Sequence, residues 1–175
     1  YAAGTQSATL TVEKANGTGT VSMEGWTYGK AQKSASASAS FGTVVIKYVI
    51  DGTKYDELPA DVKAGTHSVE FYVEDNKNYD GIATVSIPFT VAQATVDVPT
   101  IASKTYSGET QTASVAASDL YTVSTNAGGK DVGEYDVVLK LADTRNYKWA
   151  TTTEETVTLK FNVTKAMDNA WTANP

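Results

Sequence analysis

The chain has no cysteine, one histidine and two methionines among its 175 residues. The absence of cysteine excludes disulfide bonds, thiol catalysis and the usual structural zinc sites. A single histidine argues against a histidine-based catalytic triad. No stretch approaches the roughly 18 apolar residues of a membrane span, and no charged-then-apolar export signal opens the sequence. We therefore expect no membrane insertion in this segment.

Basic charge is also scarce. The 14 Lys and Arg residues are outnumbered by 20 Asp and Glu residues, which gives a net charge of −6. Residues 1–93 and residues 94–175 each hold 7 basic and 10 acidic residues, so each half carries −3. Nucleic acid and anionic membranes require a basic face on the protein that binds them. This uniform mild negative charge therefore indicates neither as a partner.

The abundant residues favour β-strands. The sequence has 26 Thr, 19 Val and 10 Tyr against 6 Leu, a composition that suits half-buried pleated surfaces. Apolar and polar residues alternate over residues 67–73, 135–141 and 156–163, and residues 44–50 indicate a further strand. Asp51-Gly52 follows that strand and predicts a tight hairpin. No stretch has a convincing helical period, so the fold class is all-β.

One long segment occurs twice. Residues 64–81 (AGTHSVEFYVEDNKNYDG) align without a gap with residues 132–149 (VGEYDVVLKLADTRNYKW). After a four-residue insertion around residues 151–155 of the second copy, the alignment continues into Phe89-Thr90-Val91 and Phe161-Asn162-Val163. Self-similarity at a fixed period is the signature of tandem modules.

The end of the last strand also occurs a third time. Residues 10–15 (LTVEKA) match residues 89–94 (FTVAQA) and residues 161–166 (FNVTKA). The chain therefore holds three copies of this strand end but only two copies of the segment that precedes it.

These matches predict two modules of roughly 75 to 80 residues, each large enough for a modest core. The first repeat is predicted at residues 1–93, where residues 1–14 would be the last strand of a preceding repeat. The second repeat is predicted at residues 94–175, where residues 167–175 would begin a further one.

Two motifs indicate how each module folds. Asp131 to Tyr135 has the D-x-G-x-Y form of a tyrosine corner, in which the hydroxyl bonds the upstream backbone and the fold is an immunoglobulin-like sandwich. The first copy has His67 in place of the tyrosine, so the corner there is modified or lost. An Asn-Tyr pair follows the strand in each copy, and its tyrosine can close one end of a core. The structural signature residues are Gly65, Gly133, Tyr135, Tyr79 and Tyr147.

With these motifs, the chain resembles the bacterial Ig-like repeats of large secreted surface proteins, including the MBG and YGX types. The matching features are Trp26 to Gly29, Ala64-Gly65-Thr66, the Asn-Tyr pairs, the strand end Phe89-Thr90-Val91 and the Lys-Ala junctions at Lys14 and Lys165. The resemblance implies an extracellular, rod-like array that serves as a stalk or adhesin component. It implies no catalytic residues. A reduced sandwich or a β-grasp-like module is the alternative fold, since the units are short for a seven-stranded sandwich.

The titratable residues point to structural roles. His67 stands at the position of Tyr135 in the other copy, so a core role suits it better than catalysis or metal binding. Asp75 and Asp143 recur and are expected to cap turns. Other carboxylates alternate with apolar residues and are expected to face solvent rather than form a glycosidase-like pair.

Two loops imitate ligand sites only in part. Asn76, Asn78 and Asp80 resemble the opening of a calcium loop, but Ile87 stands where such a loop supplies glutamate. Gly128-Gly129 lacks the helix and the Lys-Ser signature of a phosphate cradle. We therefore predict no catalytic residue, no cofactor and no metal, and the ligand-binding residues stay unknown.

Two further features have alternative interpretations. The alternating run from Ser34 to Ser40 is either a small-residue edge strand or a flexible loop. Four aromatic residues are expected in the core, with an exposed platform for sugar as the alternative: Trp26, Tyr28, Tyr106 and Trp149.

The sequence favours a non-enzymatic function. We expect structural or spacer repeats, with adhesion as a further role, in a secreted or cell-surface bacterial protein, where the neighbouring repeats of the same polypeptide are the partners. One alternative is a module that binds carbohydrate or a host glycoprotein. The other is a pair of accessory domains in a larger extracellular enzyme.

Overall fold

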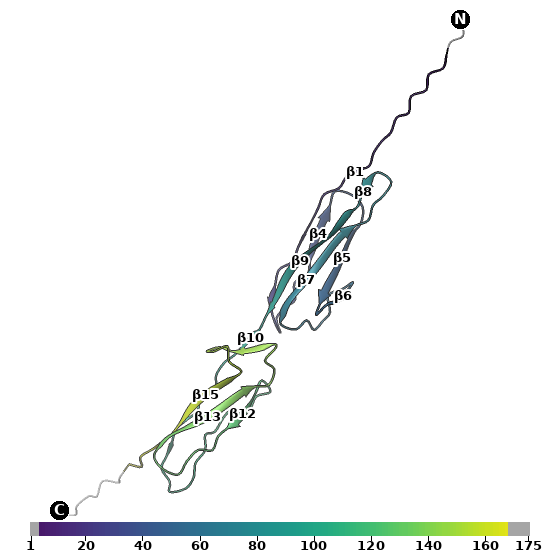
Figure 1. Ribbon diagram of the computed structural model, residues 1–175. Helices are drawn as coiled ribbons and strands as arrows, with labels where there is room; N and C mark the ends of the chain where they lie inside the picture. Colours follow the sequence, from purple (N-terminus) through teal and green to yellow (C-terminus); the bar gives the residue numbers. More distant parts are fainter. Residues whose placement is uncertain (1–3, 168–175) are drawn as a thin grey trace, which may run out of the picture. The chain divides into compact units, whose positions relative to one another are not determined.

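The computed structural model describes residues 4–167, which form two compact units (Figure 1). Unit 1 comprises the residues up to Trp26 together with Lys30–Val91, and unit 2 comprises Thr27–Gly29 together with the residues from Ala92 onward. Every regular element within the described range is a strand. The all-β prediction is therefore confirmed.

Unit 1 is organised around a five-stranded sheet with the order β3-β9-β7-β5-β6, beside two separate strand pairs, β2 with β4 and β1 with β8. Neighbours β5, β7 and β9 are antiparallel, whereas β1 and β8 are parallel. The strands are β1 (Ala15–Asn16), β2 (Gly19–Ser22), β3 (Trp26–Thr27), β4 (Ser36–Ala39), β5 (Val44–Ile50), β6 (Thr53–Tyr55), β7 (Gly65–Val73), β8 (Tyr79–Asp80) and β9 (Ile82–Ala92).

Unit 2 is organised around a four-stranded sheet with the order β11-β15-β13-β12, beside one parallel pair, β10 with β14. Strand β13 is antiparallel to both of its neighbours, and the short β11 runs parallel to the end of β15. The strands are β10 (Ala94–Val96), β11 (Lys104–Thr105), β12 (Tyr121–Thr125), β13 (Gly133–Leu141), β14 (Tyr147–Trp149) and β15 (Thr156–Thr164).

The main antiparallel pair has the same register in the two units. In unit 1 the pairs are Gly65 with Val91, His67 with Phe89, Val69 with Ile87 and Phe71 with Val85. In unit 2 they are Gly133 with Val163, Tyr135 with Phe161, Val137 with Leu159 and Leu139 with Val157. Residues that align between the two repeats therefore form the same cross-strand pairs in both units. The alignment read from the sequence is therefore also an alignment of backbone pairings.

The short parallel pairs repeat as well. The amide of Ala15 donates to the carbonyl of Asn78 at 2.8 Å, and the equivalent amide of Ala94 donates to the carbonyl of Asn146 at 2.9 Å. We call this shared set of antiparallel and parallel backbone pairings the repeat frame. It links the start of each repeat to the loop that precedes the closing strand, β9 or β15.

A two-residue turn joins β5 to β6, as the sequence predicts. Asp51 and Gly52 have φ angles of 50° and 80°, and Ile50 pairs with Thr53 across the turn. Two consecutive positive φ angles match the right-handed twist of the flanking strands, and Asp-Gly tolerates them at low cost. The run of small residues that begins at Ser34 includes strand β4, which pairs with β2 and is not a loop.

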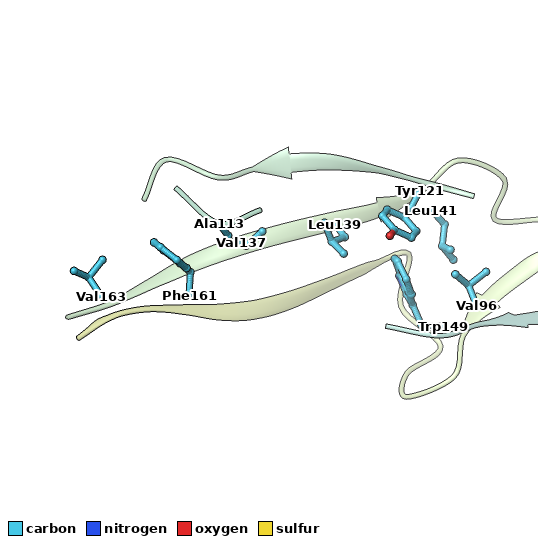
Figure 2. Close-up of a cluster of buried hydrophobic side chains, with 9 residues drawn as sticks. All are labelled: Val96, Ala113, Tyr121, Val137, Leu139, Leu141, Trp149, Phe161 and Val163. Carbon is cyan, nitrogen blue, oxygen red and sulfur yellow. The ribbon is translucent and has the colours of Figure 1, made fainter. Parts of the chain in front are cut away.

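The core of unit 2 lies on one face of the four-stranded sheet. Figure 2 shows nine buried side chains gathered along strands β13 and β15. They are Val96, Ala113, Tyr121, Val137, Leu139, Leu141, Trp149, Phe161 and Val163. Alternate residues of a strand point to one face, so the period of two in the sequence produces this cluster directly.

In unit 1 the two-stranded sheet covers part of the larger one. Phe41, Phe71 and Val73 form a buried cluster, and Val21, Ala37 and Ala39 from strands β2 and β4 pack against it. Fully burying one Val, Leu or Phe side chain contributes about 1.5 to 3 kcal/mol. The small side chains of β4 allow that strand to approach the aromatic residues beneath it.

Truncation of Leu139 should destabilise unit 2 alone. Leu139 is fully buried, and removing three buried carbons leaves a cavity, so Leu139→Ala should cost about 2 to 5 kcal/mol. Denaturant titration followed residue by residue with NMR would measure the two units separately. The control is Val123→Ala on the exposed side of β12, which should change stability by less than about 0.5 kcal/mol. Equal losses from the two variants would contradict the described core.

Candidate functional site

The tyrosine corner of unit 2 is present. The hydroxyl of Tyr135 donates to the carbonyl oxygen of Asp131 at 2.8 Å, four residues upstream. The ring leans against the unit 2 core. This hydrogen bond connects the start of β13 to the loop that precedes it, as the motif predicts.

Unit 1 keeps the corner with a different side chain. His67 is buried, and its Nε2 lies 2.9 Å from the carbonyl oxygen of Lys63, again four residues upstream. An imidazole N–H here replaces the phenol O–H as the donor. The ring also contacts Phe89 at a centroid distance of 5.6 Å. The corner is therefore modified and not lost.

The buried position of His67 limits its chemistry. Among residues 4–167 its Nδ1 has no hydrogen-bond partner, and it lies 3.9 Å from the nearest carboxylate oxygen of Asp51, which is beyond hydrogen-bond distance. A general base must reach a proton on the substrate within about 3 Å. The His67 ring is nearly inaccessible to solvent and its Nε2 bonds the backbone, so its position suits a structural role.

The paired glycines at 128 and 129 are required by packing. Gly128 has a φ of 60°, and an added Cβ would overlap the backbone oxygen of Gln111. At Gly129 an added Cβ would overlap the ring of Tyr135. Gly129 and Gln111 also exchange two backbone hydrogen bonds, of 2.9 and 3.0 Å. The absence of a side chain at Gly129 therefore leaves room for the ring of Tyr135.

The two Asn-Tyr loops are capped by different residues. In unit 2 one oxygen of Asp143 accepts bonds from the amides of Arg145 and Asn146, and the other accepts the side-chain N–H of Asn146 at 2.6 Å. In unit 1 the side chain of Asn76 accepts the amides of Asn78 and Tyr79, both at 2.9 Å. The capping role predicted for both aspartates is thus correct for Asp143. For Asp75 it is wrong, because Asn76 is the cap.

Asp75 instead forms an ion pair. Its Oδ2 lies 2.6 Å from Nζ of Lys14, and hydrogen bonding and attraction to this ammonium lower the pKa of the Asp75 carboxyl. In unit 2 the equivalent of Lys14 is Gln93, which donates to the carbonyl oxygen of Thr144 at 2.8 Å. The residue before the junction alanine therefore contacts the Asn-Tyr loop in each unit. Lys14 does so through an ion pair, and Gln93 does so through a hydrogen bond from its side-chain amide.

Carboxylates on the outer faces of the sheets pair with lysines across strands. Lys160 lies 2.6 Å from Asp136 and 3.5 Å from Glu134, and both raise its pKa, with Asp136 having the larger effect. In unit 1, Lys54 lies 2.7 Å from Glu70. Exposed pairs of this kind contribute little to stability. These carboxylates are therefore partners of lysine.

In the calcium-like loop of unit 1, the side-chain oxygen of Asn76 accepts hydrogen bonds from backbone amides of the same loop. The Asn76 side chain is occupied by two amides, as described above. Among residues 4–167 no three His, Asp or Glu side chains gather closely enough to hold a metal ion. Nor does the described part of the chain contain a helix long and apolar enough to cross a membrane.

The aromatic residues are mostly internal. Trp26 is buried and stacks on Phe89 with ring centroids 5.5 Å apart, and Trp149 is buried in the unit 2 core, where its Nε1 donates to the carbonyl of Glu155. Tyr79 stacks on Phe41 with ring centroids 4.7 Å apart, and Tyr147 packs against the unit 2 core, so each tyrosine contacts the buried cluster of its own unit. Of the four candidates for a sugar platform, Tyr28 is half-buried and Tyr106 is exposed.

A shallow depression lies on unit 2. It lies beside the parallel pair β10 and β14 and is lined by Thr95, Lys148, Trp149, Ala150, Thr151, Thr152 and Thr153. The insertion that unit 1 lacks supplies its three consecutive threonines. The amide of Ala150 donates to the carbonyl of Val96 at 2.9 Å, and the amide of Glu154 donates to the hydroxyl of Thr152 at 3.2 Å. The first bond holds the residue before the insertion against β10, and the second forms a turn within the insertion.

The lining of this depression is suited to a neutral polar ligand. Threonine hydroxyls can donate and accept hydrogen bonds, and Lys148 adds one cation. No carboxylate lines it. The threonine hydroxyls can therefore form hydrogen bonds with the hydroxyl groups of a ligand.

No protein-family model, no curated protein and no solved structure matches the chain. The resemblance to bacterial Ig-like repeats therefore depends on the sequence motifs alone.

Several residues of these sites were not predicted from the sequence. The ion pair of Lys14 with Asp75 and the amide contact of Gln93 join positions far apart in the chain. The sequence also did not predict that Gly129 packs against the ring of Tyr135. The available signal was the repeat itself, since Lys14 and Gln93 both stand directly before the alanine that starts a repeat.

Loss of the corner hydroxyl should weaken unit 2. Tyr135→Phe removes one hydrogen bond and keeps the ring, so unit 2 should lose about 0.5 to 1.5 kcal/mol. Chemical denaturation followed by NMR measures the loss. Tyr106→Phe is the control, because the Tyr106 hydroxyl makes no hydrogen bond within residues 4–167. An unchanged midpoint for Tyr135→Phe would contradict the role of the corner.

Removal of the Lys14 ammonium should raise the pKa of Asp75. The folded pKa lies below the ordinary value of 3.8, so the stabilisation from this pair is complete above that value and disappears as pH falls through the folded pKa. In Lys14→Met the carboxyl should titrate closer to 3.8, as measured by carbon-detected NMR. Lys77→Met, which alters a lysine of the same loop, should leave the titration unchanged. An unaltered Asp75 pKa in Lys14→Met would disprove the ion pair.

Proposed function

We propose that this chain is a pair of non-enzymatic structural repeats that act as spacer modules in a secreted or cell-surface bacterial protein. Each module is a reduced immunoglobulin-like sandwich in this proposal. The observation that supports it is the repeat frame: residues 65–71 pair with the closing strand of unit 1 in the same register as residues 133–139 pair with that of unit 2.

The residues that vary between the units strengthen the proposal. The corner donor is His67 in one unit and Tyr135 in the other, and the loop cap is Asn76 in one and Asp143 in the other. A catalytic or binding site that acted in both units would need the same polar groups in both. Here the pairings are kept and the polar residues change, as expected for a module whose task is to fold and to connect.

The junction between the repeats supports a mechanical role. Strand β9 ends at Ala92 and β10 begins at Ala94, so a single residue separates two hydrogen-bonded strands. Flexible linkers between domains are longer and rich in Gly, Ser or Pro. A chain that leaves one sheet and enters the next pairing at once transmits tension through backbone hydrogen bonds. Neighbouring repeats of the same polypeptide are the partners that this mechanism requires.

A second function is favoured by the threonine-lined depression of unit 2. Clustered hydroxyls with one lysine are suited to a saccharide or the glycan of a host glycoprotein. Since the insertion supplies the three consecutive threonines of the lining, this activity would belong to unit 2 and not to the array.

The two functions predict different results. If the chain is a spacer, small-angle scattering should give an elongated monomer, and adding a further copy of the repeat should lengthen the particle by a constant increment. A glycan array should then show no specific binding. Thr151→Val/Thr153→Val, which keeps the side-chain shape, should change neither result.

Specific glycan binding that this double variant abolishes would establish the carbohydrate function instead. Thr110→Val, on a threonine outside the depression, is the control and should bind as the wild type does. A particle whose length does not grow with the number of repeats would contradict the spacer function.

A further inference from the structure

Two large apolar side chains are exposed near the start of the chain. Leu10 and Val12 have 87% and 85% of their surface accessible, and residues 4–14 form no strand. Single exposed apolar residues need no explanation, but these two alternate along an extended sequence, LTVE, with the period of a strand.

Their equivalents in the repeat are deeply buried. Leu10 corresponds to Phe89 and Phe161, and Val12 corresponds to Val91 and Val163. These four side chains are 4% exposed or less. The intervening positions, Thr90 and Asn162, are exposed in both units, as is their counterpart Thr11. The leading segment therefore keeps the inward and outward alternation of a closing strand.

The segment also follows the depth of burial along that strand. Two positions earlier the closing strands have Ile87 and Leu159, which are only partly buried, and the leading segment has the smaller Ala8. Two positions earlier again, Val85 is exposed and its counterpart is the polar Gln6. Large apolar residues remain only where both units bury them completely.

The repeat frame begins immediately after this segment. Ala15 makes the amide bond to Asn78 that Ala94 makes to Asn146, and Lys14 holds the loop that Gln93 holds in unit 2. Upstream of Lys14 the pairing stops. Strand β7 cannot accept residues 10–13, because β9 and β5 already occupy its two sides. The position of a closing strand beside β7 is therefore already filled in unit 1.

From these observations we propose that residues 8–14 are a donor strand that completes the sheet of another module of this same repeat. The acceptor is a strand of the β7 and β13 type. Leu10 lies opposite its corner residue, as Phe89 lies opposite His67, and Val12 lies opposite its glycine, as Val91 lies opposite Gly65. The partner is thus defined by its chemistry: a strand that begins Gly-x-His or Gly-x-Tyr, with an apolar face and an unpaired edge. This interaction holds whether the array is a spacer or binds glycans.

The chain contains its own acceptor for a test. Strand β13 normally pairs with residues 156–163 of β15. Only three substitutions, F161L/N162T/T164E, convert residues 161–164 into the leading sequence, because Val163 and Lys165 already match Val12 and Lys14. In the full chain this variant should keep unit 2 folded. Its β15 amides should stay within about tenfold of wild-type hydrogen-exchange protection, the loss being that of a smaller core side chain. Unit 1 serves as the internal reference.

The control shifts the same sequence by one residue. F161T/N162L/V163T/T164V places TLTV, the sequence of residues 9–12, on β15 so that leucine and valine face solvent, and protection of β15 should fall at least about a hundredfold. If the matched variant loses as much protection as the shifted one, the proposal is overturned.

A second pair of variants tests where the segment acts. L10D/V12D should leave both units as stable as in the wild type, because the described chain gives these side chains no packing partner. The equivalent F161D/V163D should unfold unit 2. If L10D/V12D lowers the stability of unit 1, the segment serves its own unit and is not a donor to another module.

Discussion

The structure depends on one antiparallel pairing, between a strand that begins at a glycine and the strand that closes the repeat. Gly65 with Val91 and Gly133 with Val163 set its register. A slip of one residue would turn every buried side chain of the closing strand toward solvent. Each large apolar side chain exposed in this way would cost about 1.5 to 3 kcal/mol of folding free energy. The apolar pattern therefore specifies the register strongly.

Once this pairing is fixed, the loops around it can change with little effect on the fold. The corner accepts a phenol or an imidazole, because either can donate to a carbonyl oxygen four residues upstream. The Asn-Tyr loop accepts a cap from Asn76 or from Asp143, since both side chains offer an oxygen to the same type of turn. The insertion at residues 151–155 adds a depression to one unit and leaves the strands beside it in register.

The sequence predicted the parts of the fold that follow from local pattern and repetition. Alternation over residues 67–73 and 135–141 gave the central strands, and Asp51-Gly52 gave the turn. It did not predict the parallel pairing of Ala15 beside Tyr79, because two-residue strands have no periodicity of their own. It also could not distinguish an edge strand from a loop at Ser34 to Ser40, since small alternating residues suit both and the choice depends on the partner strand β2.

The polar contacts were harder to predict than the strands. Asp75 and Asp143 occupy equivalent positions, yet one binds a lysine and the other caps its loop. What differs is the neighbourhood: Asn76 can take over the cap in unit 1, and Lys14 is within reach of Asp75. Equivalence in sequence specifies a backbone position, whereas the partner of a polar side chain depends on residues elsewhere in the fold.

Cross-strand contacts measured by NMR test the central claim, that both units share one register. The account predicts close Hα or amide proton contacts for Gly65 with Val91 and for Gly133 with Val163, together with His67 beside Phe89 and Tyr135 beside Phe161. Contacts displaced by one residue in either unit, or found in only one of them, would contradict it.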